Sequence, residues 1–332
     1  MKDRMRTGSV ISSERAIAST RLLRIVFSVL LFGFIFVSEL ALAEDIYIVS
    51  SKLKGPHYVV AREMESRLKS VLPGHFKIRF ASVSGNSFHI NPGPKDYILT
   101  IGSRAFADVV ENNSTTNLIA TLIPRETYQA LQQANPRKEG RTSAVYIEQP
   151  VQRDLDLVRI ALPGRKPGIL LGSQSNVLEK QLRRISKELN LPLYLKKLKP
   201  DENLVAGLDQ VLENCDVLVT FADPEVSNPG TARHLLLTSY RYGIPVVAYS
   251  RAYVRAGALM AVYSTPEQFA RQTAELLLRT VRNKSDNIPD PEYPKYFSVD
   301  INQNVARSLG IDLKSAQEIE TRLRSMGRSG DE

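Results

Sequence analysis

The sequence predicts an α/β protein with two doubly wound parallel-sheet lobes. Short apolar runs alternate with amphipathic helical patterns along most of the chain, as is typical of parallel sheets with helical crossovers. Several of these runs are nearly continuous, which is the pattern of strands buried on both faces. The 332 residues also exceed what one hydrophobic core usually supports. We therefore expect two successive lobes of the same layout.

The first 43 residues have the pattern of a secretory signal peptide. Arg21 and Arg24 precede an uncharged apolar run over 25–37, and Ala41-Leu42-Ala43 follows it. A basic segment, an apolar segment and a small-x-small site in this order are typical of signal-peptidase cleavage. An uncleaved membrane anchor is the alternative, for which the apolar run is short. We expect cleavage after Ala43 and a mature periplasmic protein.

Strands and helices alternate in the first lobe. The expected strands cover 45–49, 76–83, 97–101 and 117–123. The expected helices carry an apolar face from Val60 to Val71, begin at Arg104, and run from Pro124 to Gln133. The same layout then starts again at Ser143.

From residue 143 onward, strands are expected at 143–147, 168–171, 191–198, 215–221, 244–249 and 296–302. Helices are expected at 150–162, 178–189, 204–211, 231–242, from Pro266, and at 303–309. The charged tail, 322–332, is expected to be flexible.

The stretch from Cys215 to Leu259 organises the predicted fold. It reads as a buried strand, a helix and a second buried strand, with polar residues directly after each strand. Ligands of open parallel sheets bind outside the carboxyl ends of the strands. On that rule, 221–225 and 249–255 lie side by side at a binding edge.

Two strand-to-helix turns, Gly102-Ser103 and Gly172-Ser173-Gln174-Ser175, are candidate ligand sites, as is Ser50-Ser51 after the first strand. The start of a helix presents N–H groups without intrahelical acceptors, which favour a carboxylate or a phosphate. Ser103 and Ser173 would add hydroxyl donors. Serine at a helix start is also typical of a simple N-cap, so a structural interpretation stays open.

Other candidates follow the strands of the second lobe. Asp223 is positioned to receive a ligand ammonium group, and Arg251 to form a bidentate pair with a carboxylate. Phe221 and Tyr249 would supply apolar walls. Aspartate before proline is also typical of a turn, so Asp223 has a structural interpretation too. Arg255 is interpreted as a solvated charge.

Several classes of protein are not supported. The sequence has no dinucleotide-binding, phosphate-loop, zinc-protease or serine-hydrolase motif. The four histidines are dispersed without metal-ligand spacing, so we expect neither a metal nor a cofactor. The basic residues are scattered, which does not support nucleic-acid binding. Cys215 is the single cysteine, so no intramolecular disulfide forms, and we expect it to be buried and inert.

Local motifs resemble the substrate-binding family of ABC transporters with the type I periplasmic-binding-protein fold. The better-known members of that family are similar to aromatic amino-acid binders. The motifs are Gln149-Pro150-Val151, Lys166 to Leu170, Cys215 to Leu218 with Ala222-Asp223, Ile244-Pro245-Val246, Gly257-Ala258-Leu259 and Phe297 to Ile311. The match extends over 145–313, while 44–140 matches by layout alone. Leu122 to Arg125 stands where that family often has a glycine-rich turn.

The resemblance implies a multi-segment hinge, because such chains cross between their lobes three times. The implied first lobe is 44–147 plus 264–292, and the second is 148–263 plus 293–321. The implied function is capture of a small polar, carboxylate-bearing ligand and its delivery to the membrane permease of an ABC transporter, by a monomer. A ligand sensor that signals to a membrane receptor, and an enzyme built on the cleft, are the alternatives.

Overall fold

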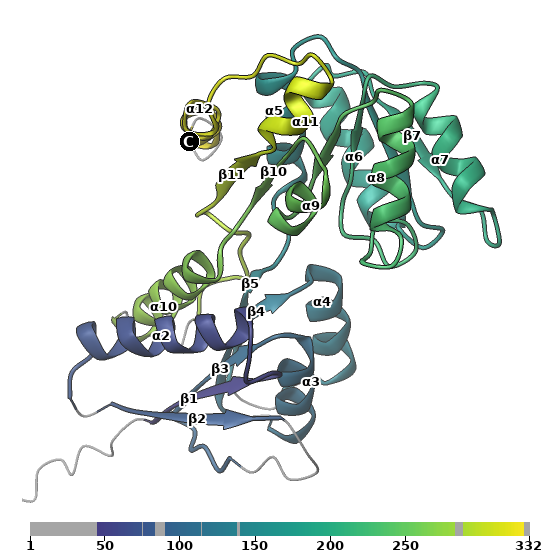
Figure 1. The fold of residues 1–332 in the computed structure, drawn as a ribbon. Coiled ribbons are helices and arrows are strands. Elements are labelled where there is room, and N and C mark those ends of the chain that lie inside the picture. Colours follow the sequence, from purple (N-terminus) through teal and green to yellow (C-terminus); the bar gives the residue numbers. More distant parts are fainter. Residues whose placement is uncertain are drawn as a thin grey trace, which may run out of the picture. The chain divides into compact units, whose positions relative to one another are not determined.

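The computed structural model describes two β-sheets with their helices (Figure 1). The described residues are 45–74, 76–83, 90–113, 115–137, 140–282 and 288–328. The predicted signal peptide, 1–43, and residues 329–332 of the predicted tail lie outside them. None of the described helices is long and apolar enough to cross a membrane.

The first sheet has five parallel strands in the order β2-β1-β3-β4-β5. They are β1 (Asp45–Ser50), β2 (Lys77–Ser82), β3 (Tyr97–Ile101), β4 (Asn117–Ile123) and β5 (Thr142–Tyr146). Ser50, Ile101 and Thr121 are partners across β1, β3 and β4. Because these strands are parallel and in this register, the loops that follow them lie at one edge of the sheet.

Helices cover both faces of the first sheet. They are α2 (Pro56–Val71), α3 (Ser103–Asn112), α4 (Arg125–Ala134) and α10 (Pro266–Arg282). Ile48 of β1 packs in one core with Met64 of α2 and Phe269 of α10. Its neighbour Val49 packs in a second core with Phe106 of α3. Successive side chains of a strand point to opposite faces, so this sheet is doubly wound as predicted.

The second sheet has the order β11-β10-β9-β8-β6-β7. Its strands are β6 (Pro167–Leu171), β7 (Tyr194–Lys197), β8 (Val217–Val219), β9 (Val246–Ala248), β10 (Met260–Tyr263) and β11 (Ser298–Ile301). All neighbouring strands pair parallel except β10 and β11. The strands β8 and β9 are neighbours, which confirms that the two ends of the organising stretch share one edge.

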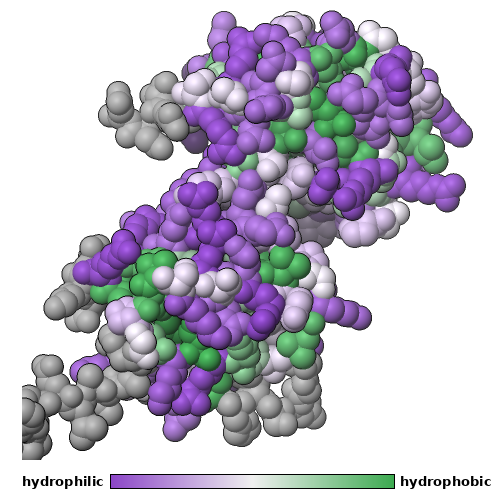
Figure 2. Space-filling view, turned by 60° about the vertical axis from the view of Figure 1, so that its left-hand side comes forward, coloured by the Kyte–Doolittle hydropathy of each residue, from purple (hydrophilic) through white to green (hydrophobic). Residues whose placement is uncertain are grey.

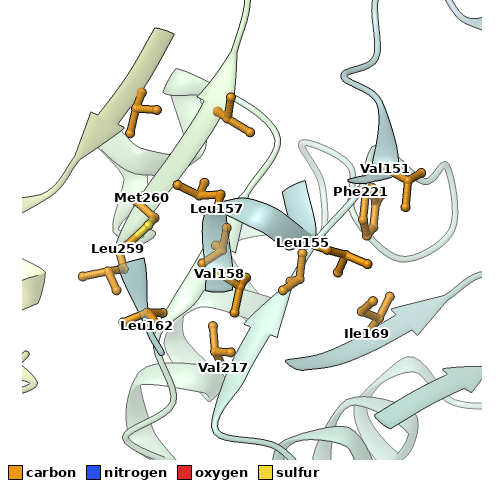
Figure 3. Close-up of a cluster of buried hydrophobic side chains, with 14 of the residues drawn as sticks. Val151, Leu155, Leu157, Val158, Leu162, Ile169, Val217, Phe221, Leu259 and Met260 are labelled. Carbon is orange, nitrogen blue, oxygen red and sulfur yellow. The ribbon is translucent and has the colours of Figure 1, made fainter. Parts of the chain in front are cut away.

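Two cores also flank the second sheet. The helices are α5 (Val151–Ala161), α6 (Asn176–Glu188), α7 (Leu204–Leu212), α8 (Ala232–Arg241), α9 (Arg251–Ala256), α11 (Gln303–Ser308) and α12 (Ala316–Arg328). Figure 3 shows one core, in which Leu155 and Val158 of α5 lie among Ile169, Val217 and Met260 of the strands. The helices α7, α8 and α9 contribute to the other core.

Three features of the second lobe differ from the sequence prediction. A loop is predicted after Tyr249, but Ser250 caps the short helix α9 by accepting a hydrogen bond from the Tyr253 N–H. The strand β10 is not predicted, because four residues are too short to show a period. The strand β11 is predicted as part of a parallel sheet. It runs antiparallel to β10 instead, because its first residue, Ser298, pairs with the last residue of β10, Tyr263.

The predicted flexible tail is wrong over residues 322–328. Those residues continue the helix α12, which begins at Ala316. Ile319 and Leu323 are buried and pack in the core that contains α5. Apolar side chains four residues apart thus hold the helix against the sheet, and the many charges around them hid this pattern.

The chain passes between the sheets three times. It leaves β5 of the first sheet for α5, which packs on the second. It returns from β10 to α10 and then enters β11. At the last passage, the ring of Phe297 lies 4.3 Å from the guanidinium carbon of Arg153 and 4.5 Å from that of Arg324. The exact lobe boundaries given above stay a prediction.

The burial of Cys215 gives a direct test of the second core. Its side chain packs beside Val211 and Leu218, and burial raises the pKa of the thiol to about 11. We expect the native protein to react with iodoacetamide far more slowly than the denatured protein, because the thiolate is the reactive form. Mass spectrometry of the alkylated chain measures this. Complete labelling of the native protein within minutes would contradict the packing of this core.

Candidate functional site

The sequence-predicted binding residues fall into two groups, one at the carboxyl edge of each sheet. Ser50, Ser51, Gly102 and Ser103 follow β1 and β3 of the first sheet. The second group follows β6, β8 and β9 of the second sheet: Gly172, Ser173, Gln174, Phe221, Asp223, Tyr249 and Arg251. The two groups differ in how their polar groups are satisfied.

In the first group, Ser51 positions the start of α3. Its hydroxyl oxygen accepts a hydrogen bond of 2.8 Å from the Ala105 N–H, and its own N–H donates to the Ile101 carbonyl at 3.0 Å. Ser50 is buried, and its hydroxyl donates to the Lys52 carbonyl at 2.7 Å. Both serines therefore shape the loop after β1.

Ser103 and Arg104 are the first residues of α3. Within the described part of the chain, their backbone N–H groups have no hydrogen-bond acceptor, and the Ser103 hydroxyl has no partner. Gly102 precedes them as the N-cap and supplies no side-chain cap. The start of α3 thus retains two N–H donors and a hydroxyl group for a ligand.

His57 is a site residue that the sequence analysis missed. A Cβ atom on Gly102 would lie 2.5 Å from the His57 Cε1 atom and 2.8 Å from the Ser51 hydroxyl oxygen, so the imidazole sits directly against this turn. Gly102 also has φ +90°, so a side chain there would be strained as well as crowded. One sequence signal could have pointed to His57. Gly55-Pro56 indicates that a helix begins shortly after the buried strand β1, which puts His57 in its first turn.

The His57 imidazole is neutral at pH 7. Burial and the nearby Lys52 charge lower its pKa, and a hydrogen bond with the backbone of Ile101 opposes this shift. Its Nδ1 atom is buried and has no hydrogen-bond partner among the described residues. A neutral imidazole with one nitrogen used as donor can accept a hydrogen bond from a ligand at the other.

In the second group, Asp223 ties two loops together. Its Oδ2 atom accepts hydrogen bonds from the Gly172 N–H at 2.9 Å and the Ser175 hydroxyl at 2.6 Å. Its Oδ1 atom accepts from the N–H groups of Glu225 and Val226, both at 2.9 Å. Burial raises the pKa of Asp223, but these four hydrogen bonds outweigh it, so the pKa lies below its ordinary value.

These bonds revise the predicted role of Asp223. A carboxylate has about four lone-pair sites, and all of them are occupied here, so none is left for a ligand ammonium group. Glu225 completes the arrangement, because its carboxylate accepts a 2.6 Å hydrogen bond from the Ser173 N–H. The turn before α6, predicted to bind an anionic ligand, is therefore already filled by two carboxylates of the chain itself.

The remaining residues of the second group lie at different depths. Phe221 is buried in the core beside Val151 (Figure 3), so it is not an exposed wall. Tyr249 is half-buried, and its hydroxyl donates to the Ser227 carbonyl at 2.9 Å. Gln174 is exposed.

Arg251 is the cation at this edge. Its side chain is 55% exposed, and its Nε–H donates to the Asp300 carboxylate at 3.0 Å. The other guanidinium N–H groups have no partner among the described residues. Since a guanidinium carries five donors, Arg251 can hold Asp300 and still bind a second carboxylate.

The described part of the chain contains no group of three or more His, Cys, Asp or Glu side chains that could hold a metal ion.

The comparisons with known proteins support the fold. No protein-family model matches this sequence, and no curated protein sequence matches it. A ligand-free, open substrate-binding protein with adhesive properties from Clostridium difficile is 16% identical, with a TM-score of 0.65, over 82% of this chain and 96% of that chain. An ABC domain in complex with L-Trp from Streptococcus pneumonia is 13% identical, with a TM-score of 0.55, over 82% of this chain and 96% of that chain.

A conserved domain protein from Vibrio cholerae is 15% identical, with a TM-score of 0.56, over 84% of this chain and 98% of that chain. At these identities the likeness concerns the fold. The chain has the two-sheet α/β fold of type I periplasmic binding proteins, and the predicted fold class is confirmed.

The structural role of Asp223 is testable by stability measurements. Asp223→Ala leaves the N–H groups of Gly172 and Val226 without their acceptor in a buried setting, so we expect the free energy of unfolding to fall by about 2–3 kcal/mol. The pKa of Asp223 in the folded protein is depressed. The difference in unfolding free energy between wild type and variant is therefore largest above pH ~4, and it shrinks as the pH falls through that folded-state pKa. Urea unfolding at several pH values measures it.

Asp312→Ala is the matched control, since Asp312 is exposed and no side-chain contact of it is found among the described residues. It should leave the stability unchanged. Equal stability of Asp223→Ala and Asp312→Ala at pH 7 would show that the Asp223 network does not hold the loops.

Proposed function

We propose that the chain is an exported solute-binding protein of an ABC transporter. It captures a small polar, carboxylate-bearing ligand between its two lobes and delivers it to a membrane permease. It acts as a monomer, without a metal or cofactor, and it catalyses no reaction on its ligand.

The observation that carries this proposal is the unequal state of the two helix starts. At α6 the N–H donors are occupied by Asp223 and Glu225. At α3 the N–H groups of Ser103 and Arg104 have no acceptor within the described residues. A ligand carboxylate supplies the missing negative charge at α3, as Asp223 does at α6.

The other candidate residues receive supporting roles. His57 accepts a hydrogen bond from the ligand, and the ring of Tyr249 covers its apolar part. Arg251 binds a second acidic oxygen of the ligand from the opposite lobe. Ser50, Ser51 and Gly102 position α3, while Gly172, Ser173 and Asp223 keep the loop before α6 in shape. Phe221 supports this loop from the core.

The similar structures agree with this function. The Clostridium difficile protein is described as a substrate-binding protein, and the Streptococcus structure holds L-Trp. Both align with nearly their whole length to this chain. The predicted signal peptide adds that the protein meets its ligand outside the cytoplasm.

Arg251→Gln tests the ligand contact. A thermal-shift screen over L-amino acids and small carboxylates first identifies a ligand, and calorimetric titration then measures its affinity. Loss of one charge-assisted contact costs about 1.5–3 kcal/mol, so Arg251→Gln should bind about ten- to a hundredfold more weakly. The melting temperature of the ligand-free variant should stay near that of wild type, because the Arg251–Asp300 pair is exposed.

Arg255→Gln is the matched control on the same helix. Arg255 is exposed, and its side chain has no hydrogen bond or ion pair among the described residues. This variant should bind like wild type. An equal loss of affinity in both variants would point to a general charge effect, and unchanged affinity in Arg251→Gln would exclude that residue from the site.

Export is tested separately by the mass of the mature chain. The small side chains of Ala41 and Ala43 suit a signal peptidase, so the protein recovered from the cell envelope should begin at Glu44. Intact-mass spectrometry reads this directly. A membrane-bound species that keeps residues 1–43 would refute export by cleavage.

A further inference from the structure

A pocket of about 380 Å³ lies on the first sheet, between the start of α2 and the end of β2. Its walls come from the ends of β1 and β2, from the loop after β1, and from α2. The lining residues are Ser50, Lys52, Leu53, Tyr58, Ala61, Arg62, Phe80, Ala81 and Ser82. Gly102, Ser103 and His57 do not line it, whereas Ser50 of the first candidate group does. Its volume falls within the range of small-molecule sites.

Three large apolar side chains reach the surface in this pocket. Leu53, Tyr58 and Phe80 are each about half exposed or more, and they come from a loop, a helix and a strand. Figure 2 shows hydrophobic residues reaching the surface among hydrophilic ones in the part of the molecule that holds the first sheet. Exposed apolar side chains that converge on a concave surface are typical of a binding site.

The charge at the pocket is positive. Lys52 has no acidic partner among the described residues. Arg62 pairs with Glu65 at 2.5 Å, but Glu65 also pairs with Lys69 at 2.6 Å, so two cations share one carboxylate. The other carboxylates of α2 and β1, Glu63 and Asp45, are bound by Arg67 and Arg79.

No carboxylate lines the pocket among the described residues. An anionic group of a ligand would therefore meet Lys52 and Arg62, whereas an ammonium group would find no acceptor of opposite charge and would pay for its desolvation. This distinguishes the pocket from a site for amino acids, which must hold both charges.

We propose that this pocket binds a small aromatic carboxylate that lacks an ammonium group. The carboxylate lies against Lys52 and Arg62, and the ring packs on Tyr58 and Phe80. The inference goes beyond the proposed function, because Lys52, Arg62, Tyr58 and Phe80 carry no ligand contact there and the ligand here lacks an ammonium group.

Hydrocinnamate and L-phenylalanine test this chemistry, because they share a ring, a chain and a carboxylate and differ by the ammonium group. Calorimetric titration of the mature protein should show one site for hydrocinnamate, with at least about tenfold weaker binding of L-phenylalanine there. Hydrocinnamyl alcohol, which lacks the charge, should also bind at least about tenfold more weakly.

Variants then locate the site. Lys52→Gln with Arg62→Gln, and separately Phe80→Ser, should each weaken hydrocinnamate about ten- to a hundredfold. Lys54→Gln and Val71→Ser are the matched controls, since both residues are exposed, lie near or on α2 and do not line the pocket. Both controls should bind hydrocinnamate like wild type, and melting curves should show that all variants are folded.

Three results would overturn the proposal. They are no binding of hydrocinnamate at millimolar concentration, equal binding of L-phenylalanine at the same site, and binding of hydrocinnamate that the Lys52, Arg62 and Phe80 changes leave intact. Arg62 and Phe80 have no role in the proposed transport function, and the Lys52 charge enters it only through the pKa of His57. A failure here therefore leaves that function standing, and a failure of the Arg251 test leaves this pocket standing.

Discussion

The hydrogen bonds of Asp223 fix the carboxyl edge of the second sheet. One carboxylate joins the turn after β6 to the loop after β8, through three backbone N–H groups and one hydroxyl. The loop in turn receives the hydroxyl hydrogen bonds of Tyr249 and Tyr253 at Ser227 and Asn228. The position of the Tyr249 ring therefore depends on the same carboxylate. Gly172 is required at the closest point, because a Cβ atom there would lie 2.7 Å from Asp223 Oδ1.

Five strands of the second sheet follow the strand order of the first sheet, but the carboxyl edge of the first sheet has the opposite chemistry. Within the described part of the chain, no carboxylate fills the turn before α3. His57 of α2 lies against Gly102, and Ser51 of the loop after β1 accepts from the Ala105 N–H, while the N–H groups of Ser103 and Arg104 have no acceptor among the described residues. One helix start is thus neutralised by the chain and the other retains its partial positive charge. Under the proposed function, this asymmetry would give a carboxylate ligand one preferred end. Arg251, the first residue of α9 after β9, is an exposed cation.

The sequence was sufficient for much of the fold because the long elements are strongly periodic. The strand Asn117–Ile123 matches its prediction residue for residue, and the strand ends on β8 and β9 meet as expected. Short elements such as β10 carry no period, and the direction of β11 depends on where the chain re-enters the sheet. The candidate residues do lie at the strand ends where the sequence placed them, but the contacts of their side chains were not predictable. Residue type does not reveal that Asp223 faces four donors, or that His57 lies against Gly102, because both depend on loop geometry.

We infer that the helix start of α3, and not that of α6, is open to the ligand. Amide hydrogen exchange followed by NMR tests this most directly. In the ligand-free protein, the N–H groups of Gly172 and Ser173 should be protected by their carboxylate acceptors, while those of Ser103 and Arg104 exchange rapidly. A saturating carboxylate ligand should then slow exchange at Ser103 and Arg104 and leave Gly172 unchanged. Slow exchange at Ser103 without ligand, or ligand protection confined to Gly172 and Ser173, would contradict the account.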